Sequence, residues 1–490
     1  MDTDIALDIL KAALPKDRFA FRGTDEFKYL NSSAYMSGLN ADITPACIIQ
    51  PRNKLDISIF LQLITPFVKV GTTVFAIVGA GNQLSRGCSN TENGITLNLA
   101  LMKGIEIKDG FVSVGAGETC GSVYRKLEEQ GLACAGPRSA SSGLAGLALS
   151  GGLSIFSSRE GFVCDNVVNY EVVLASGAIV NANANENTDL WLALRGGGNN
   201  FGVVTRFDIR TIAYAGHNFP NQVKALVHEL QNPNPDASHH IHLKISLETS
   251  IRFMPDSAVG FNQLYYTDGV ERPPVLEPFS NMEPQFLNTL RMQSFAEAAK
   301  EQSSKTMPIV RIVPTISRFA CMNTHVKPDF DTLVSGGNIW WQSVAPLKSC
   351  EGFSCTYTLQ PYPRSLLEAS VKRGGNSLGM TPHAGAIVSI ALLAYWAKRD
   401  DDERIISTLN ATLERLDENA IARGTAVKFK CLNHSFDFQD LIRSYGVDNK
   451  IRLQNASIQY DPDGVFQKGV PGGWKLWTLR RLLLKAVWAF

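Results

Sequence analysis

Short apolar runs separated by glycine-containing turns dominate the chain from about residue 43 to residue 214. Several of these runs are rich in β-branched residues and bounded by turn residues, which predicts strands: ACIIQP, TVFAIVGAG, GITLNLALM, GIEIKDGFVSVGAG, YEVVLASGAIVNA and FGVVTRFDIRTI. The fourth contains a DG hairpin turn and the fifth an SG turn. Between these two, GSVYRKLEEQG predicts a helix that ends at Gly131. Hairpins with interspersed helices indicate an α+β domain.

Longer elements are predicted in the second half of the chain. HIHLKISLETSIRF, AVGFNQLYYTDG and AIVSIALLAYW alternate or are continuously apolar, which predicts long strands. EPFSNMEPQFLNTLRMQSFAEAAKEQ (277–302) and RDDDERIISTLNATLERLDENAIARG (399–424) predict helices around them. The stretch 215–240, with NPNPDASHH, predicts a linker. This half of the chain therefore favours an antiparallel sheet with helices on one side.

The composition is that of an ordinary globular protein. Of 490 residues, 44% are hydrophobic and 19% charged, which is enough for two or three hydrophobic cores. The formal net charge is +1 and no basic stripe is present, so we expect no nucleic-acid partner. The N-terminal MDTDIALDILKAALPKDRF predicts a short amphipathic helix and not a secretory signal. No apolar run reaches the roughly eighteen residues of a membrane-spanning helix.

The nine cysteines are scattered, odd in number and without CxxC spacing. This pattern argues against a zinc site or a disulfide framework, and we predict no metal site. Buried free thiols are the expected state, with a local bridge between Cys350 and Cys355 as the alternative. Because a secretion signal is also missing, the cysteines indicate a reducing compartment, and we expect the protein in the cytoplasm.

The stretch AIVGAGNQLSRGCSN raises the first question of chemistry. It follows an apolar run and contains two glycines of a Rossmann fingerprint, Gly79 and Gly81. The position of the third glycine is Leu84, and the following LSRGCSNTENG is a loop pattern and not an amphipathic helix. The stretch is therefore not the dinucleotide loop of a Rossmann fold.

Three glycine-dense stretches lie within the first domain, at 79–87, 136–154 and 195–205. Glycines and small hydroxyl residues leave backbone N–H groups accessible, and such nests bind pyrophosphate without a lysine. Each stretch taken singly is more simply a tight turn. Three together, without a Walker lysine or a cluster of metal ligands, favour a dinucleotide held by the backbone.

These stretches, together with ITPACIIQPRNKLDIS and DNVVNYEVVLASGAIVNANANENTDLWLALRGGGNNFGVVTRFDIRTI, make the chain resemble the FAD-linked oxidoreductases of the vanillyl-alcohol-oxidase type. The likeness is strongest to the berberine-bridge-enzyme-like branch that is common in fungal secondary metabolism. It runs nearly unbroken from 43 to 212 and resumes weakly over 431–476. It implies an α+β fold, with a PCMH-type two-subdomain FAD-binding domain plus an antiparallel-sheet substrate domain with helices on one side.

The same resemblance gives the expected division of the chain. The FAD-binding domain is expected at 1–214, with its core at 43–214, and the substrate domain at 215–430. Residues 431–476 are expected to return to the FAD domain, and 477–490 form an extra tail. The tail, WTLRRLLLKAVWAF, has the basic and apolar mixture of an interfacial membrane anchor. We favour instead an unselected or mis-spliced tail that packs weakly.

The resemblance also implies which residues bind FAD. Residues 78–83 would surround the pyrophosphate, parts of 139–152 would form a second wall, and the backbone at 202–204 would meet the adenine end. The residues concerned are Val78, Gly79, Ala80, Gly81, Asn82, Gln83, Ser139, Ser142, Gly143, Gly146, Gly152, Gly202, Val203 and Val204. Asp165 and Asn166, in CDNV, are expected to brace the cofactor loops, with a simple capping turn as the alternative.

Two departures from the family pattern concern covalent attachment of the flavin. Many relatives bond the flavin through a His at the position of Asn82, and others add a Cys at the position of Ser139. Asn cannot form this bond, and a neutral Ser hydroxyl is a much weaker nucleophile than a thiolate. We therefore predict non-covalent FAD with a lowered reduction potential, which favours easier oxidations or redox-neutral use of the pocket.

The catalytic base is expected where the chain returns to the flavin. Relatives often have tyrosines on either side of a Leu-Asn step; in CLNHS, Asn433 matches, but Cys431 and His434 replace the tyrosines. His434 is predicted as the general base, with Asn433 beside it, because a histidine pKa lies near working pH. A surface or hydrogen-bonded His is the alternative. Further pocket candidates, each more often used for packing, are His242, Tyr265, Tyr266, His383 and Trp396.

The predicted function is oxidation of a small organic metabolite by hydride transfer to flavin N5, with dioxygen as acceptor. One alternative is a flavin-containing cyclase, which the departures at Asn82, Cys431 and His434 keep open. The other alternative is a non-catalytic protein that binds FAD or a metabolite.

Overall fold

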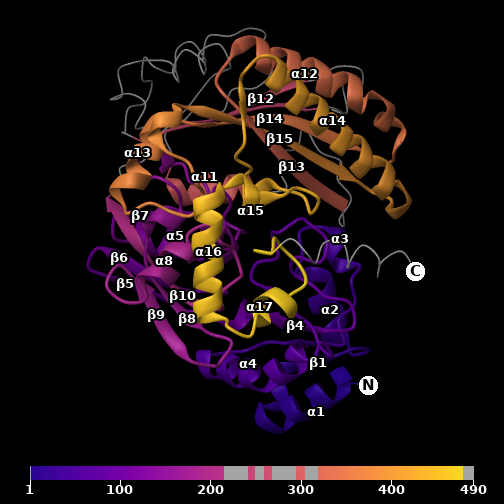
Figure 1. The fold of residues 1–490 in the computed structure, drawn as a ribbon, viewed down its shortest axis with the longest axis vertical. Coiled ribbons are helices and arrows are strands. Elements are labelled where there is room, and N and C mark those ends of the chain that lie inside the picture. Colours follow the sequence, from indigo (N-terminus) through magenta and orange to yellow (C-terminus); the bar gives the residue numbers. More distant parts are fainter. Residues whose placement is uncertain (1, 214–240, 249–258, 268–293, 304–317, 478–490) are drawn as a thin grey trace.

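Figure 1 shows the computed structural model of the chain, which describes residues 2–213, 241–248, 259–267, 294–303 and 318–477. Three sheets are present within these residues, one of four strands and two of six. Helices lie between and against the sheets, so the predicted α+β class is confirmed. The linker at 215–240 and residues 478–490 of the tail lie outside the described residues.

The first sheet has the order β1 (Phe19–Phe21), β2 (Cys47–Ile49), β4 (Ile95–Asn98) and β3 (Phe75–Val78). β2 and β3 run parallel to β4, and β1 is antiparallel to β2. The parallel arrangement needs a crossover, which is α4 (Lys54–Lys69). No helix was predicted here, although the buried Ile57, Phe60, Ile64 and Val68 follow helical spacing.

The second sheet is antiparallel and has the order β5 (Ile105–Lys108), β6 (Phe111–Gly115), β10 (Val203–Ala213), β8 (Val167–Val173) and β9 (Ile179–Asn183), with β7 (Leu132–Cys134) also paired to β10. β5–β6 and β8–β9 are the hairpins predicted from the DG and SG turns. The predicted helices are α5 (Cys120–Glu128) and, at the N-terminus, α1 (Asp2–Ala13). Two short helices, α6 (Leu144–Leu149) and α8 (Thr188–Leu194), precede glycine loops.

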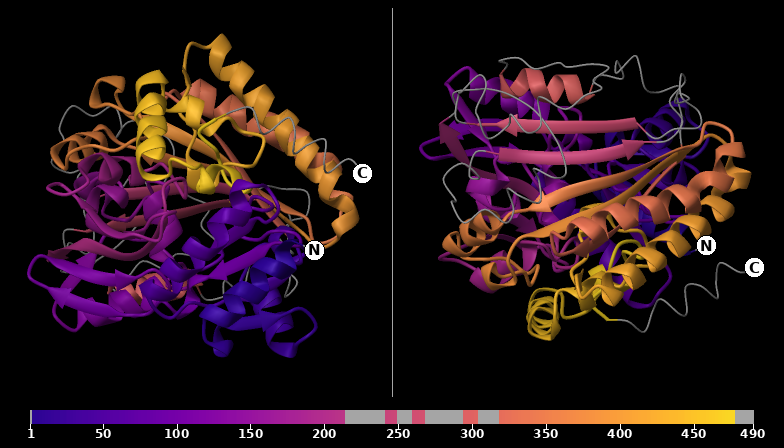
Figure 2. Two further views of the ribbon diagram at one scale, coloured as in Figure 1. Left: turned by 60° about the horizontal axis from the view of Figure 1, so that its bottom comes forward. Right: turned by 90° about the horizontal axis from the view of Figure 1, so that it is seen from above.

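The third sheet has the order β12 (Val259–Tyr266), β11 (Ile241–Glu248), β14 (Ser354–Tyr362), β15 (Ile387–Trp396), β13 (Arg318–Val326) and β16 (Ala426–Val427), and every pair is antiparallel. The long helices α12 (Phe330–Val344) and α14 (Asp402–Ala422) cover one face, as Figure 2 shows. This is the predicted arrangement. β13, β14 and α12 were not predicted, and the described part of the helix expected at 277–302 is α11 (Phe295–Ser303).

The two faces of the third sheet differ in polarity because side chains alternate along each strand. On β14, Cys355, Tyr357 and Leu359 belong to the apolar core beneath α12 and α14. The opposite face of β14 presents Thr356, Thr358, Gln360 and other polar residues. This second face lies against the first domain, because Tyr265 and Tyr362 on it belong to the core of that domain.

The last part of the chain returns to the first domain, as expected. α15 (Leu441–Ser444) is followed by α16 (Val447–Tyr460), which packs on α8, and by α17 (Val465–Lys468), which packs on α4. In Figure 1 this yellow segment runs down the middle of the molecule. All nine cysteines are free and buried, which confirms the expected thiols and excludes the Cys350–Cys355 bridge. Among the described residues, no helix is long and apolar enough to cross a membrane.

Candidate functional site

The first glycine stretch, which we call the first cofactor loop (79–87), leaves the end of β3 and is fixed by backbone contacts. Gly81 has a φ of +63°, and a Cβ there would overlap the carbonyl oxygen of Ala34. The carbonyl of Gly81 accepts a hydrogen bond from Met36 N–H at 3.0 Å. Only glycine fits at position 81, because a side chain has neither the backbone conformation nor the space.

The first cofactor loop touches the second glycine stretch directly. A Cβ on Gly143 would lie 2.7 Å from Cβ of Ala80, and Gly143 N–H donates to Oδ1 of Asn82 at 3.4 Å. The same stretch is held from behind by Cys120 N–H, which donates to the carbonyl of Ser142 at 2.9 Å. Asn82 is exposed at this contact. Its position is the one at which the resemblance implies a covalent bond to the flavin in many relatives.

Open space borders the two loops on one side. Gly146 in α6 is exposed, and a Cβ built on it would meet no atom within 4 Å. Ser139 and Ser142 are half-buried, and Ser139 Oγ lies 3.0 Å from Oγ of Ser141. Accessible glycine backbone and small hydroxyl groups form a surface that suits a pyrophosphate. The residues present therefore fit FAD, which would lie against Gly79, Gly146 and their neighbours.

The third glycine stretch (195–205) joins the second one. Gly198 N–H donates to the carbonyl of Leu149 at 3.0 Å. Leu378, from the second domain, sits against both Gly151 and Gly196, where an added Cβ would lie 2.9 and 2.6 Å from its methyl carbons. Gly152 has a φ of +76°. The structure thus brings the three predicted stretches together.

Asp165 and Asn166 brace this region from within the core. Oδ2 of Asp165 accepts from Phe162 N–H at 2.8 Å, and Oδ1 accepts from Nδ2 of Asn376 at 3.0 Å. Asn166 donates to the carbonyls of Glu160 and Phe162, both at 2.8 Å. Burial raises the pKa of Asp165, and the bond from Asn376 opposes this. Both residues are fully buried, so they hold the loops and have no surface with which to touch a cofactor.

The stretch expected at the adenine end is explained by packing. Gly202 precedes β10, and a Cβ on it would lie 2.6 Å from Cγ1 of Val172. Val203 and Val204 are buried and pair with β8. Sheet packing alone therefore requires a glycine at position 202.

Arg195 is a buried residue beside the glycine stretches that sequence reasoning missed. It follows α8, is fully buried, and lies over the ring of Trp191, with 3.6 Å between its guanidinium carbon and the ring centroid. Nη1 donates to the carbonyls of Arg373 and Gly375 at 2.9 and 2.8 Å. Burial lowers its pKa. Arg195 thereby ties a loop of the second domain to the glycine stretch that begins beside it.

The CLNHS segment (431–435) lies between the two domains. Oδ1 of Asn433 accepts from Gly152 N–H at 3.1 Å, which joins the segment to the second glycine stretch. Asn323 on β13 binds the same segment from the sheet: its Oδ1 accepts from Cys431 N–H at 2.9 Å, and its Nδ2 donates to the Cys431 carbonyl at 3.1 Å. Asn433 is therefore engaged with backbone, whereas His434 beside it is half-buried.

A second histidine, His325 on β13, lies near His434. It is fully buried, with its ring 4.8 Å from Phe429 and 5.4 Å from Tyr362 between centroids. Burial holds its pKa well below 6.5, and the charges of Lys430 and His434 lower it further. His325 is therefore neutral at neutral pH.

The sheet face across from the glycine loops has a polar part and an aromatic part. In the polar part, Oγ1 of Thr358 lies 2.9 Å from Ser246 Oγ, and Gln360 accepts a bond from Arg138 at 2.6 Å. In the aromatic part, the rings of Phe319 and Tyr395 stack with centroids 4.1 Å apart, next to Leu84 of the first cofactor loop. Such a face suits an organic molecule with both oxygen functions and an apolar portion.

Only some pocket candidates lie on this face. Tyr265 does, and burial raises its pKa to about 12, so its phenol is neutral. Tyr266 and Trp396 were wrong candidates, because both pack in the apolar core under α12 and α14, where the Trp396 indole donates to Asp402. His383 was also wrong: it lies exposed in a turn before β15. His242 stands opposite Tyr265 on β11, with its side chain outside the described part.

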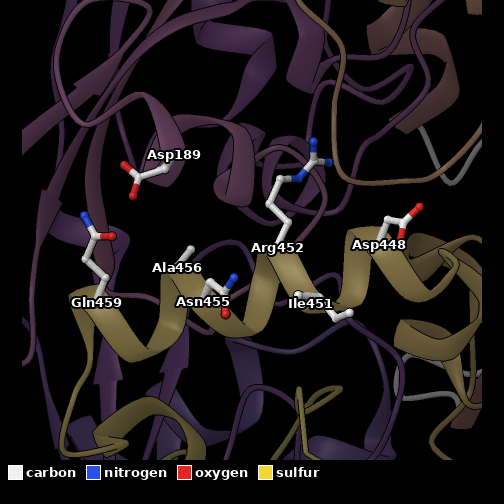
Figure 3. Close-up of a pocket in the computed structure, with 7 residues that line it drawn as sticks. All are labelled: Asp189, Asp448, Ile451, Arg452, Asn455, Ala456 and Gln459. Atoms are coloured by element: carbon white, nitrogen blue, oxygen red, sulfur yellow. The ribbon is translucent and has the colours of Figure 1, made fainter.

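A separate cavity of about 350 Å³ lies between α8 and α16, and none of the predicted site residues lines it. Figure 3 shows its lining, in which Asp189 comes from α8 and the other six residues come from α16. Oδ1 of Asp189 also accepts a bond from Tyr460 at 2.5 Å. The residues that line this cavity are mostly exposed and polar, unlike those of the glycine loops and the sheet face.

Comparison with known proteins decides the family. Residues 45–183 match the model of the FAD binding domain. The FAD-dependent monooxygenase FUP4 of Fusarium proliferatum is 31% identical over 462 residues, which cover 91% of this chain and 87% of the relative. The chain belongs to this family of FAD-linked oxidoreductases. The oxidoreductase is also similar to the bifunctional solanapyrone synthase of Alternaria solani, at 30% identity over 88% of this chain and 82% of the relative.

The fold of the oxidoreductase agrees with this assignment. Berberine bridge enzyme from Eschscholzia californica superposes with a TM-score of 0.71 at 16% identity, covering 96% of this chain and 100% of the other. The PCMH-type, berberine-bridge-like fold expected from the sequence is confirmed. The match to the FAD binding domain and the FAD-dependent relatives identify FAD as the cofactor of this oxidoreductase.

Proposed function

We propose that this oxidoreductase binds FAD non-covalently and oxidises a small organic metabolite of secondary metabolism. The observation that supports this most is convergence. Three glycine stretches far apart in the sequence meet one another, and the CLNHS segment joins them through the bond between Asn433 and Gly152. Across from them lies the sheet face with its hydroxyl and aromatic parts.

The proposal of a loosely held cofactor rests on Asn82 and Ser139. Oδ1 of Asn82 accepts from Gly143 N–H, so this side chain serves the contact between the two loops. A carboxamide and a neutral hydroxyl are poor nucleophiles toward a flavin. The backbone of the glycine loops would then hold the cofactor without a covalent bond.

In the proposed reaction, FAD bound against Gly79 and Gly146 would supply the two-electron acceptor for the oxidation, with dioxygen as the final acceptor. His434 accepts the proton that leaves the substrate oxygen as the C–H bond breaks. Its Nδ1 has no accessible surface, so Nε2 is the nitrogen that we assign to this proton. The bond from Asn433 to Gly152 keeps the segment in place, and the sheet face orients the substrate.

Two simple measurements test the proposal. Purified protein should be yellow, and acid precipitation should release the FAD into the supernatant. Colour that stays in the pellet would contradict the non-covalent attachment. A colourless protein that takes up no added FAD would leave only a non-catalytic role. Bleaching of the flavin band by a candidate substrate without oxygen would demonstrate the oxidation directly.

A second candidate function is a flavin-containing cyclase. Cys431 stands where relatives have a tyrosine, and burial raises the pKa of its thiol, so that position offers no base at neutral pH. The similarity to a relative named a synthase is in line with a ring-forming or condensing activity. Product formation without bleaching of the flavin would favour the cyclase over the oxidase.

A further inference from the structure

The first cofactor loop and the CLNHS segment are connected by a chain of buried hydrogen bonds. Its members are Asn40, Ser85, Ser435 and Asn323, all of which are at most 1% exposed. We propose that this chain is a positioning network: it transmits the position of the first cofactor loop to His434. This inference rests on the proposed function, in which His434 acts beside the flavin.

The network begins at Asn40, which is fully buried and binds the backbone of the first cofactor loop. Nδ2 of Asn40 donates to the carbonyls of Gln83 and Ser85, both at 3.1 Å. Its Oδ1 accepts from Gly87 N–H at 3.0 Å. One carboxamide therefore holds three backbone groups of the loop, which leaves the loop a single arrangement at this point.

The middle of the network crosses from the loop to the CLNHS segment. Oγ of Ser85 donates to the carbonyl of Ser435 at 3.0 Å, between residues 350 positions apart in the chain. Oγ of Ser435 in turn donates to the carbonyl of Cys431 at 2.8 Å. The two serine hydroxyls thus bracket His434, which lies between the bonded residues of the segment.

Asn323 closes the network on the sheet. Its Nδ2 donates to Ser435 Oγ at 2.8 Å, in addition to its two bonds with the backbone of Cys431. Gln439 holds the backbone of Asn323 in place: its Nε2 donates to the Asn323 carbonyl at 2.8 Å and its Oε1 accepts from Asn323 N–H at 3.2 Å. The buried carboxamide of Asn323 is thus bonded at both ends, as buried polar groups require.

The network couples the ordering of two segments that are far apart in the sequence, the first cofactor loop and the CLNHS segment. A cofactor that orders the first cofactor loop also orders the CLNHS segment, and the coupling works equally in the reverse direction. Weakening the sheet end should therefore weaken FAD binding, although Asn323 lies on the substrate sheet and outside the cofactor loops.

The test uses a double-variant cycle on the full chain, with FAD affinity as the readout. We expect Ser85→Ala and Ser435→Ala each to raise the Kd of FAD about fivefold, and the double variant to raise it no more than the stronger single variant. Ser89→Ala is the matched control: Ser89 is buried in the adjoining stretch and, among the described residues, has no hydrogen bond with CLNHS. Multiplied effects, or a Kd unchanged in Ser435→Ala, would overturn the network.

A second readout follows the position of His434 beside the flavin. Sulfite adds to flavin N5 and is the probe, because its affinity depends on the groups around that atom. We expect its Kd to shift at least threefold in Ser85→Ala and in Asn323→Asp, measured on the fraction that has bound FAD. Variants that are less stable but keep the wild-type sulfite Kd would reduce the network to a structural role. Wild-type protein that takes up no FAD would instead contradict the proposed function.

Discussion

The glycine loops of the first domain and the third sheet of the second domain form opposite sides of the proposed site, but they are built differently. In the loops, backbone conformation decides: Gly81 and Gly152 have positive φ values, and Gly143 and Gly202 have no room for a Cβ. On the sheet, the alternation of side chains along each strand determines which residues face the site. Thr356 and Thr358 face the site, while Cys355 and Tyr357 face the helices.

This difference has a consequence for what each side tolerates. A loop that depends on missing side chains can accept almost no substitution, and it binds the part of a cofactor that never changes. The side chains of a strand that face the site can be exchanged without changing the apolar core, because successive side chains point to opposite faces of the sheet. We infer that substrate preference in this family varies on the sheet while the cofactor loops stay the same.

The largest effect is expected from Gly81→Ala. The added Cβ would overlap the Ala34 carbonyl in a backbone conformation that is already unfavourable for alanine. We expect the free energy of unfolding to fall by more than about 4 kcal/mol, with little FAD in the purified protein. Gly385→Ala is the matched control, since Gly385 has a φ of +72° but open space around it. Its ψ of −170° is a conformation that alanine rarely adopts, so this variant should cost only the roughly 1–3 kcal/mol of the conformation. Equal losses in both variants would contradict the steric argument.

The contact between the two sides is tested at Arg318. This side chain is 7% exposed and pairs with Asp42 after α3 (Gly38–Ala41) at 2.8 Å and with Asp402 in α14. Arg318→Met leaves two carboxylates unpaired and should lower the unfolding free energy by about 3–5 kcal/mol in denaturant titrations. Arg364→Met, which breaks an exposed pair with Glu368, should cost less than about 0.5 kcal/mol. A small loss at Arg318 would mean that the domains do not depend on this brace.

A pH dependence is expected from Asp461, which follows α16 and is buried. Burial raises its pKa from 3.8 to about 6, although its carboxylate accepts bonds from Val465 and Phe466 N–H groups at 2.7 and 2.8 Å. The folded protein holds the Asp461 proton more tightly than the unfolded chain does. The contribution of this group to the free energy of unfolding is therefore fully present below pH 3.8 and is lost as pH rises through about 6. The loss is about 3 kcal/mol. Unfolding of wild type and Asp461→Asn at several pH values measures it. Parallel curves for the two proteins would refute the assignment.

A smaller effect, on rate and not on stability, is expected from His434→Ala. Without the proposed base, flavin reduction by substrate should slow at least about tenfold, which corresponds to about 1.4 kcal/mol of barrier. Anaerobic stopped-flow absorbance at the flavin band measures this rate. His383→Ala is the control, because His383 is an exposed histidine outside the sheet face. An unchanged rate in His434→Ala would remove this histidine from the mechanism.

The smallest effect is expected from Gly146→Ala, which distinguishes a cofactor surface from a packing position. No atom lies within 4 Å of the added Cβ, so the apoprotein should be as stable as wild type. Bound FAD would meet the new methyl group, and we expect its Kd to rise about threefold, or about 0.7 kcal/mol. A Kd equal to that of wild type would place the cofactor away from α6.

That the three glycine stretches lie together could be predicted from the sequence, because the signals that mark each stretch are local. A glycine in a turn, a DG step between alternating runs, or an Asn in place of a histidine can be read without knowledge of the fold. α4 was missed, although Asn53 caps its N-terminus and its apolar spacing is helical. This helix could have been predicted from its local signals alone.

The sheet side was predicted less well because its signals are distant. β14 reads SCTYTLQPY, and its inward polar residues resemble those of a solvent-exposed strand or loop. Asn323 is an unfavourable residue for a strand. Its partners Cys431 and Gln439 follow 108 and 116 residues later, so only the folded chain reveals its role. Arg195 was overlooked for the same reason, since its partners lie on the loop after α13 (Arg364–Lys372).

The buried cysteines have a consequence for the working life of the protein. If dioxygen is the acceptor, as proposed, turnover would release peroxide beside the enzyme's own side chains, and peroxide attacks thiolates far faster than thiols. Burial raises the pKa of Cys88 to about 11 and those of Cys47 and Cys134 to about 12, so these sulfurs remain protonated. The buried thiols would thereby be protected from the by-product of the proposed reaction, and the enzyme could complete many cycles without oxidising its own cysteines.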